Sequence, residues 1–183
     1  MIARQDSPVS DASGTRSGAA RGRLCLLVAG VAPAVAAVVA SGLEWGRLLV
    51  NGRLVVIDSG LSLWQGMVVL IAAVAGAVVM ALSIAAGRAR VASLAALVPG
   101  MVIAAVATEA LVWLVARPAD LADRVRAGAE AIALKGYVVP PIESILGPGG
   151  WIALAAGLLM MAAGLLGIVV PAWRARRGAA DGG

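Results

Sequence analysis

Several residue types that build soluble active sites are scarce or missing in this chain of 183 residues, which has no histidine and one cysteine, Cys25. The lack of histidine excludes the commonest metal ligand and general base, and with them His-ligated haem and Ser-His-Asp chemistry. One cysteine excludes an intramolecular disulfide, a CxxC redox pair and a Cys-ligated zinc site. We therefore expect a non-enzymatic protein with no catalytic residues, no metal ligands and no cofactor.

Charge is also scarce. Charged residues make up 14% of the chain, whereas soluble domains have about 25%. Apolar residues make up 61%, and the mean hydropathy is +0.96. This composition excludes an ordinary water-soluble domain. The net charge of +5 comes from basic residues that flank apolar runs, so it predicts membrane topology and not nucleic-acid binding.

Four apolar runs are long enough to cross a bilayer as helices, because about 20 helical residues span about 30 Å of hydrocarbon. The sequence therefore predicts an all-α membrane protein, a four-transmembrane-helix bundle, since open strands cannot satisfy their amides in lipid. The runs are residues 24–42, 65–87, 91–116 and 151–173. The remaining segments are a disordered tail (1–23), an outer loop (43–64), an inner turn (88–90), a second outer loop (117–150) and a C-terminal tail (174–183).

The charge distribution predicts the orientation. The two tails and the turn at 88–90 carry nine basic and three acidic residues, whereas the two longer loops carry six of each. Basic residues concentrate on the cytoplasmic side of membrane proteins. We therefore expect a multi-pass protein of the cytoplasmic membrane with both termini inside and both longer loops outside.

The tryptophans lie near the predicted span ends, where an indole suits the lipid headgroup level. We interpret all five as interface anchors: Trp45, Trp64, Trp113 and Trp151 at the outer ends and Trp173 at the inner end.

Both outer loops contain structure signals. Asn51-Gly52 between two β-prone runs predicts an extracytoplasmic β-hairpin with a type I′ turn. Its strands are too apolar to stand free, so we expect them to pack on the helix ends, on the other outer loop or on a partner. In the second loop, residues 118–135 predict a short amphipathic helix on the membrane surface.

The first run has a second interpretation, because Arg21 and Arg23 before an apolar stretch also fit a signal peptide. Ala34-Val35-Ala36 resembles a cleavage site. The apolar run continues through Gly42 and 23 residues precede it, so we expect this segment to be retained as a span.

Glu109 is the one ionisable residue within a predicted span, and Thr108 precedes it. Such residues are functional candidates, because a carboxylate near the bilayer centre is costly. Three interpretations stay open: a carboxylate that snorkels or pairs with Arg47 or Arg117, a proton- or cation-handling group, and a polar lock between helices. The first is our preferred interpretation.

Short motifs give a family resemblance. They are Trp45, Asp58-Ser59-Gly60, Gly87-Arg88-Ala89-Arg90 and Gly149-Gly150-Trp151. In these the chain resembles the small four-span actinobacterial membrane proteins of the tryptophan-operon-associated family. The resemblance implies the same four-span plan and no established activity.

On these grounds we expect an accessory or scaffold protein that contacts the lipid bilayer and other membrane proteins or itself. The alternative is a small oligomeric transporter or channel component that uses Glu109.

The orientation predicts a labelling pattern. In a Cys25→Ala background, an impermeant thiol reagent should label Asn51→Cys and Ser144→Cys in intact cells. Ala89→Cys should react only after permeabilisation, because the turn at 88–90 carries the basic residues that stay inside. Labelling of position 89 from outside would reverse the predicted topology.

Overall fold

Each of the four apolar runs forms a helix in the structure, a computed structural model that describes residues 28–132 and 138–180. The first helix is Val28–Gly42, followed by α2 (Trp64–Ala85), α3 (Ala89–Ala131) and α4 (Pro148–Ala180). The last three are long and apolar enough to cross a membrane, whereas Val28–Gly42 is shorter. The predicted tail 1–23, residues 24–27 and Cys25 lie outside the described residues.

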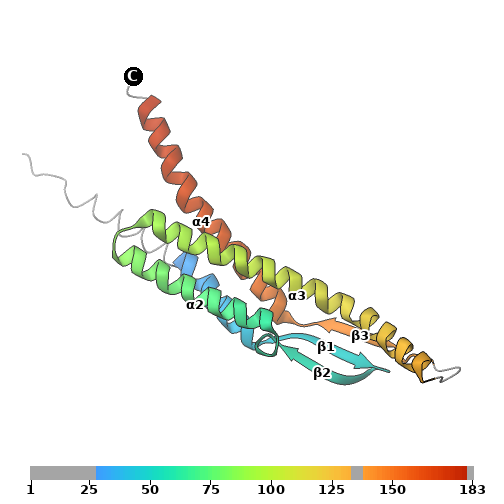
Figure 1. Ribbon diagram of the computed structural model, residues 1–183. Helices are drawn as coiled ribbons and strands as arrows, with labels where there is room; N and C mark the ends of the chain where they lie inside the picture. Colours follow the sequence, from blue (N-terminus) through green and yellow to red (C-terminus); the bar gives the residue numbers. More distant parts are fainter. Residues whose placement is uncertain (1–27, 133–137, 181–183) are drawn as a thin grey trace, which may run out of the picture.

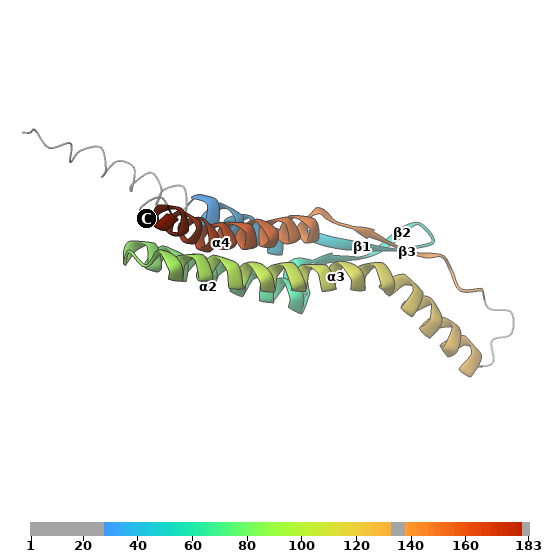
Figure 2. The same ribbon diagram turned by 90° about the horizontal axis from the view of Figure 1, so that it is seen from above.

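The helices lie side by side, with α3 packed against both α2 and α4, and a small sheet extends beyond one end of them (Figures 1 and 2). We call this the sheet end, and we call the opposite end, where Gly87 links α2 to α3, the turn end. Gly87 ends α2 with φ +72°, a left-handed conformation that glycine adopts readily.

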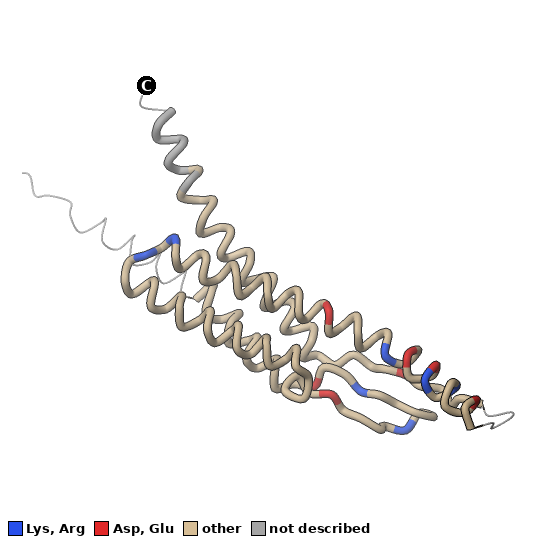
Figure 3. Tube along the Cα trace, viewed as in Figure 1, with Lys and Arg blue, Asp and Glu red and all other residues tan. Residues whose placement is uncertain are grey.

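Charged residues of the described chain gather at the two ends, and the bundle between them is almost free of charge (Figure 3). At the turn end the charges are Arg88 and Arg90, whereas both signs mix at the sheet end. This arrangement fits a bundle that crosses a membrane, and the location of its turn end in the cytoplasm stays a prediction.

The distribution of side-chain size is the reverse of that in a soluble protein, whose core holds the large apolar residues. Twelve of the twenty buried apolar residues in the described chain are alanine. Large side chains instead cover the outside of every helix, among them Val35, Ile71, Leu82 and Leu166. Small residues inside and large ones outside are typical of helices that pack within lipid.

Glycines let α3 and α4 approach backbone to backbone. A Cβ added at Gly157 would lie 2.7 Å from the Ala104 amide nitrogen and 3.0 Å from the Gly100 carbonyl oxygen. One added at Gly164 would lie 2.7 Å from the Leu97 nitrogen. Gly157 lies four residues after Ala153, and small residues at this spacing let helix backbones approach closely.

The predicted hairpin is confirmed. β1 (Glu44–Val50) and β2 (Arg53–Ser59) pair in antiparallel fashion around Asn51 (φ +53°) and Gly52 (φ +70°), the two positive φ angles that a type I′ turn needs. A short 3₁₀ turn, η1 (Gly60–Ser62), leads into α2.

A third strand completes the sheet. β3 (Ile142–Leu146), from the second outer loop, pairs with β1, so the strand order is β2-β1-β3. Of the three sites considered for the hairpin, the structure shows two: the other loop, through β3, and helix α3, against which Gly46 lies. The fold is therefore not all-α but mostly helical, with a three-stranded antiparallel sheet. Two hydrogen-bonded strands are marginal in water, and a third gives the hairpin stability.

Two predicted helix boundaries are wrong. The amphipathic helix expected at 118–135 is not separate, because α3 continues without a break to Ala131; residues 133–137 lie outside the described chain. Pro118 bends a helix rather than ending it when neighbouring residues favour helix, and Figure 2 shows α3 bending in its distal third. Likewise α4 continues to Ala180, since Ala and Arg are strong helix formers.

The α3–α4 contact predicts a sharp difference between two glycines. Gly157→Ala should lower the free energy of unfolding in detergent by about 1–3 kcal/mol, because its methyl group meets rigid backbone. Gly128→Ala in α3 is the control: nothing lies within 4 Å of its added Cβ, so it should be neutral or stabilising by up to about 1 kcal/mol. Equal thermal unfolding temperatures for the two variants would contradict the close packing.

Candidate functional site

Trp45 lies at the junction between the helices and the sheet. Its side chain is completely buried, at 0% exposure, and its indole N–H donates to the carbonyl oxygen of Ala40 at 2.8 Å. The prediction that Trp45 faces the lipid headgroups is therefore wrong. A ring whose N–H has a partner inside the protein can be buried without an unsatisfied polar group.

Glycines from two other segments make room for this ring. A Cβ at Gly60 would lie 2.5 Å from Trp45 Nε1, and one at Gly149 would lie 2.5 Å from Trp45 Cδ1. Two main-chain hydrogen bonds hold these segments in place: Gly60 N–H donates to Leu43 at 3.0 Å, and Gly147 N–H donates to Trp45 at 2.8 Å. The indole thus joins the first helix, the start of α2 and the start of α4.

One face of the sheet rests on α3. A Cβ at Gly46 of β1 would lie 3.0 Å from Leu114 of α3, and Leu48, two residues further on the same face, is buried. This contact places the sheet against α3 near the end of the apolar run 91–116.

An ion pair ties the edge strand to the same helix. Arg117 of α3 donates a hydrogen bond to the carboxylate of Asp58 in β2, 59 residues earlier in the chain. The Arg117 guanidinium also lies over the ring of Trp113, 4.8 Å from its centroid, in a cation–π contact. The side chains of Asp58 and Arg117 are only 11% and 23% exposed, so solvent screens this pair less than a surface pair.

The other face of the sheet is open and carries apolar side chains. Ile57 and Ile145 lie on either side of Arg47 in one cross-strand row, and both isoleucines are more than half exposed. Leu54 and Val55 of β2 are also exposed. We call Leu54, Val55, Ile57 and Ile145 the open sheet face.

A charge lies within this apolar row. Arg47 pairs with Glu44, and the hydrogen bonds to the Glu44 carboxylate, together with its negative charge, raise the pKa of the guanidinium. Arg47 is paired with Glu44, and Arg117 is paired with Asp58. Neither arginine is therefore the partner of Glu109 that the sequence suggested.

Glu109 lies on the outside of α3. Its side chain is exposed, and it makes no hydrogen bond or ion pair with any residue in 28–132 or 138–171. The interpretation of Glu109 as a lock between helices of one chain therefore finds no contact in this part of the molecule. Thr108 is also exposed, and its hydroxyl donates to the Ala104 carbonyl at 2.8 Å, a back-bond within the same helix.

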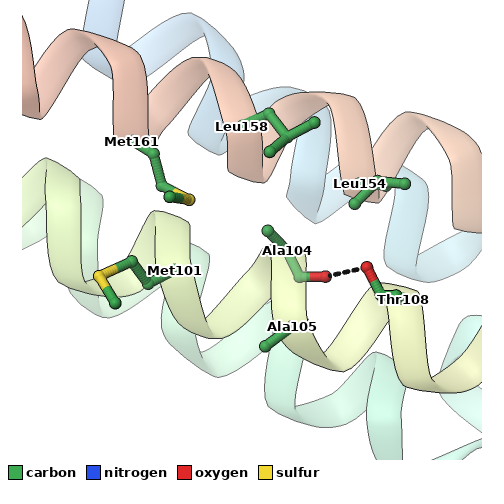
Figure 4. A pocket seen from close by; sticks show the side chains of 7 residues that line it. All are labelled: Met101, Ala104, Ala105, Thr108, Leu154, Leu158 and Met161. Atoms are coloured by element: carbon green, nitrogen blue, oxygen red, sulfur yellow. Dashed lines mark hydrogen bonds between the residues drawn. The ribbon is translucent and has the colours of Figure 1, made fainter.

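A shallow groove of about 400 Å³ runs between α3 and α4 beside these residues. Figure 4 shows side chains from both helices around it. They are Met101, Ala104, Ala105 and Thr108 of α3 and Leu154, Leu158 and Met161 of α4. The lining is apolar apart from one hydroxyl, so the groove suits an acyl chain or an apolar helix and not a polar substrate.

The other four tryptophans are partly exposed. Trp64 and Trp151 lie at the first turns of α2 and α4, at the sheet end, and Trp113 lies in α3 near the same end. Trp173 lies near the far end of α4. Their contact with lipid headgroups stays a prediction.

Sequence reasoning missed β3 and the Asp58–Arg117 pair. The segment Ile142-Glu143-Ser144-Ile145-Leu146 is bounded by Pro141 and Gly147, but its apolar and polar residues do not alternate, so it carries only a weak strand signal. Nothing local connects Asp58 with Arg117, because the sheet brings them together.

Among the described residues, no cluster of three or more Cys, Asp or Glu side chains is placed to hold a metal ion.

No family model and no curated protein matches this chain.

The Asp58–Arg117 pair should contribute measurably to stability. Asp58→Asn leaves the half-buried Arg117 without its counter-charge and should lower the free energy of unfolding by about 1–3 kcal/mol. Asp120→Asn breaks the pair with Arg124, whose side chains are 63% and 74% exposed, and should cost at most about 0.5 kcal/mol. Denaturation in detergent followed by tryptophan fluorescence measures both; equal effects would show that the pair adds nothing.

Proposed function

We propose that this chain is a non-enzymatic accessory protein of the cytoplasmic membrane that presents the open sheet face to a protein partner outside the cytoplasm. The three long apolar helices make it a multi-pass membrane protein. The open sheet face is the observation that carries the proposal, because it lies beyond the helix ends, where lipid does not cover it.

The sheet has the rigidity that a docking surface needs. Trp45, the Asp58–Arg117 pair and α3 fix its covered face, so little conformational entropy is lost when the other face binds. Exposed apolar patches outside a membrane usually mark interaction sites. β2 is also an edge strand, and its backbone groups can pair with a strand of another protein.

The arrangement around Trp45 also bears on family membership. Trp45, Gly60 and Gly149 come from three separate motifs that the chain shares with the tryptophan-operon-associated family, and the three meet at one junction. We infer that these motifs encode the joint between the spans and the sheet. This supports membership of that family as a proposal.

A transport role receives less support. Glu109 faces outward from the bundle, so an ion pathway past it has to form between several copies. Loss of ion flux in proteoliposomes containing Glu109→Gln would favour this alternative over the accessory function.

Site-specific photo-crosslinking tests the accessory function. Benzoylphenylalanine in place of Ile57 or Ile145 should give the same discrete protein adduct in native membranes, because both side chains lie on one face. The matched control position is Arg124, which is exposed but lies on the polar surface of α3. Adducts with lipid alone at positions 57 and 145 would contradict a protein partner.

A second arm tests the energetics. Ile57→Asp should reduce recovery of the partner about tenfold or more, because it places a charge in a desolvated contact. The thermal unfolding temperature should stay unchanged, since this side chain is exposed in the isolated protein.

A further inference from the structure

Glu109 takes no part in the open sheet face or in the proposed contact between that face and a partner protein. It is the one charged residue within the apolar run 91–116. It is exposed on α3 and has no polar partner among residues 28–132 and 138–171. A carboxylate in this position needs either water or a donor, because hydrocarbon offers neither.

The depth of Glu109 makes hydration of its carboxylate costly. Glu109 lies about 8 Å of helix beyond the midpoint of the run 91–116, and the hydrocarbon extends about 15 Å from the bilayer centre. The short side chain of glutamate reaches less far than that of lysine or arginine. Val112 and Val115 are exposed on the helix turns between Glu109 and the sheet end, and exposed Trp113 lies one turn from Glu109 on the same face, so the surface that leads to the headgroups is apolar apart from one indole N–H.

Neither arginine that the sequence suggested as a partner for Glu109 is free. Arg117 binds Asp58 and stacks on Trp113, and Arg47 binds Glu44. A second copy has the same lack, because residues 28–42, 64–85, 91–116 and 148–171 contain no lysine or arginine. Two copies that met at this face would instead bring like charges together.

The surface next to Glu109 has the shape for a helix. Residues four apart lie on the same helix face, so Glu109 continues the ridge of Ala105, which lines the groove between α3 and α4. Ala104, Ala105 and Thr108 form the α3 wall together with the flexible side chain of Met101 (Figure 4), and the small residues allow another helix to approach closely. The Thr108 hydroxyl already has an acceptor in Ala104, so the groove itself does not repel an apolar helix.

We propose that this groove and Glu109 bind a transmembrane helix of a different protein that carries a lysine or arginine at the depth of Glu109. The inference rests on the proposed accessory function and adds a second contact within the membrane. Apolar packing in the groove positions the partner helix, and the carboxylate selects it, because only a partner with a donor removes the desolvation cost of Glu109.

The test uses the full chain in its native membranes with benzoylphenylalanine in place of Leu158, a groove residue. The adduct should contain a peptide from a membrane-spanning helix of another protein with a lysine or arginine in that helix. Its yield should fall about tenfold in Glu109→Gln and in Glu109→Leu, since both remove the charge. Replacement of the partner's basic residue by methionine should lower the yield similarly. Val78, exposed on α2, is the control position and should give lipid adducts.

Three outcomes would overturn the proposal: an adduct with a second copy of this chain, lipid adducts alone, or a protein adduct whose yield is the same in the Glu109 variants as in the unchanged protein. Each can occur while the open sheet face still yields its own adduct, so failure here is separate from failure of the accessory function. Neither variant should change the thermal unfolding temperature in detergent, because Glu109 makes no polar contact within the described chain. A large drop would assign Glu109 to the fold and would also overturn the proposal.

Discussion

Close approach of helix backbones is the constraint on which this structure depends. Lipid is as apolar as a leucine side chain, so burying large apolar groups between helices gains little, and packing contacts hold the bundle instead. Gly100, Gly157 and Gly164 let α3 and α4 meet backbone to backbone. Alanines continue this pattern through the core. The large side chains are then free to face outward, which explains the high hydropathy of so small a protein.

The same constraint fixes the position of the sheet. Trp45 is the one large aromatic ring that the described core admits, and Gly60 and Gly149 leave the space that it fills. Its N–H bond to Ala40, near the end of the first helix, sets where that helix stops and β1 begins. The sheet therefore inherits its orientation from the helices and is not a flexible loop resting on them.

The features of the fold that could be predicted from the sequence are those set by residues close together in the chain. The four helices, the turn at Asn51-Gly52 and the small-residue contact at Gly157 come from local pattern, and the structure contains them. The burial of Trp45 was not predictable, because a tryptophan at a span end has the same sequence signature whether it faces lipid or glycine. β3 needed a partner strand from a loop nearly one hundred residues earlier.

The candidate site also has features that the sequence predicts and features that only the structure shows. Composition alone identified Glu109, because a charge within an apolar run is conspicuous, but only the packed helices show which way it faces. The positions of Arg117 and Arg47 explain why the outward direction of the Glu109 side chain matters. Arg117 and Arg47 lie at the sheet end, where β1 and β2 bring Asp58 and Glu44 to them. The sheet thus pairs the two arginines that the sequence suggested as partners for Glu109. By stabilising its own extramembrane part, the fold leaves the intramembrane carboxylate dependent on a donor from outside the described chain.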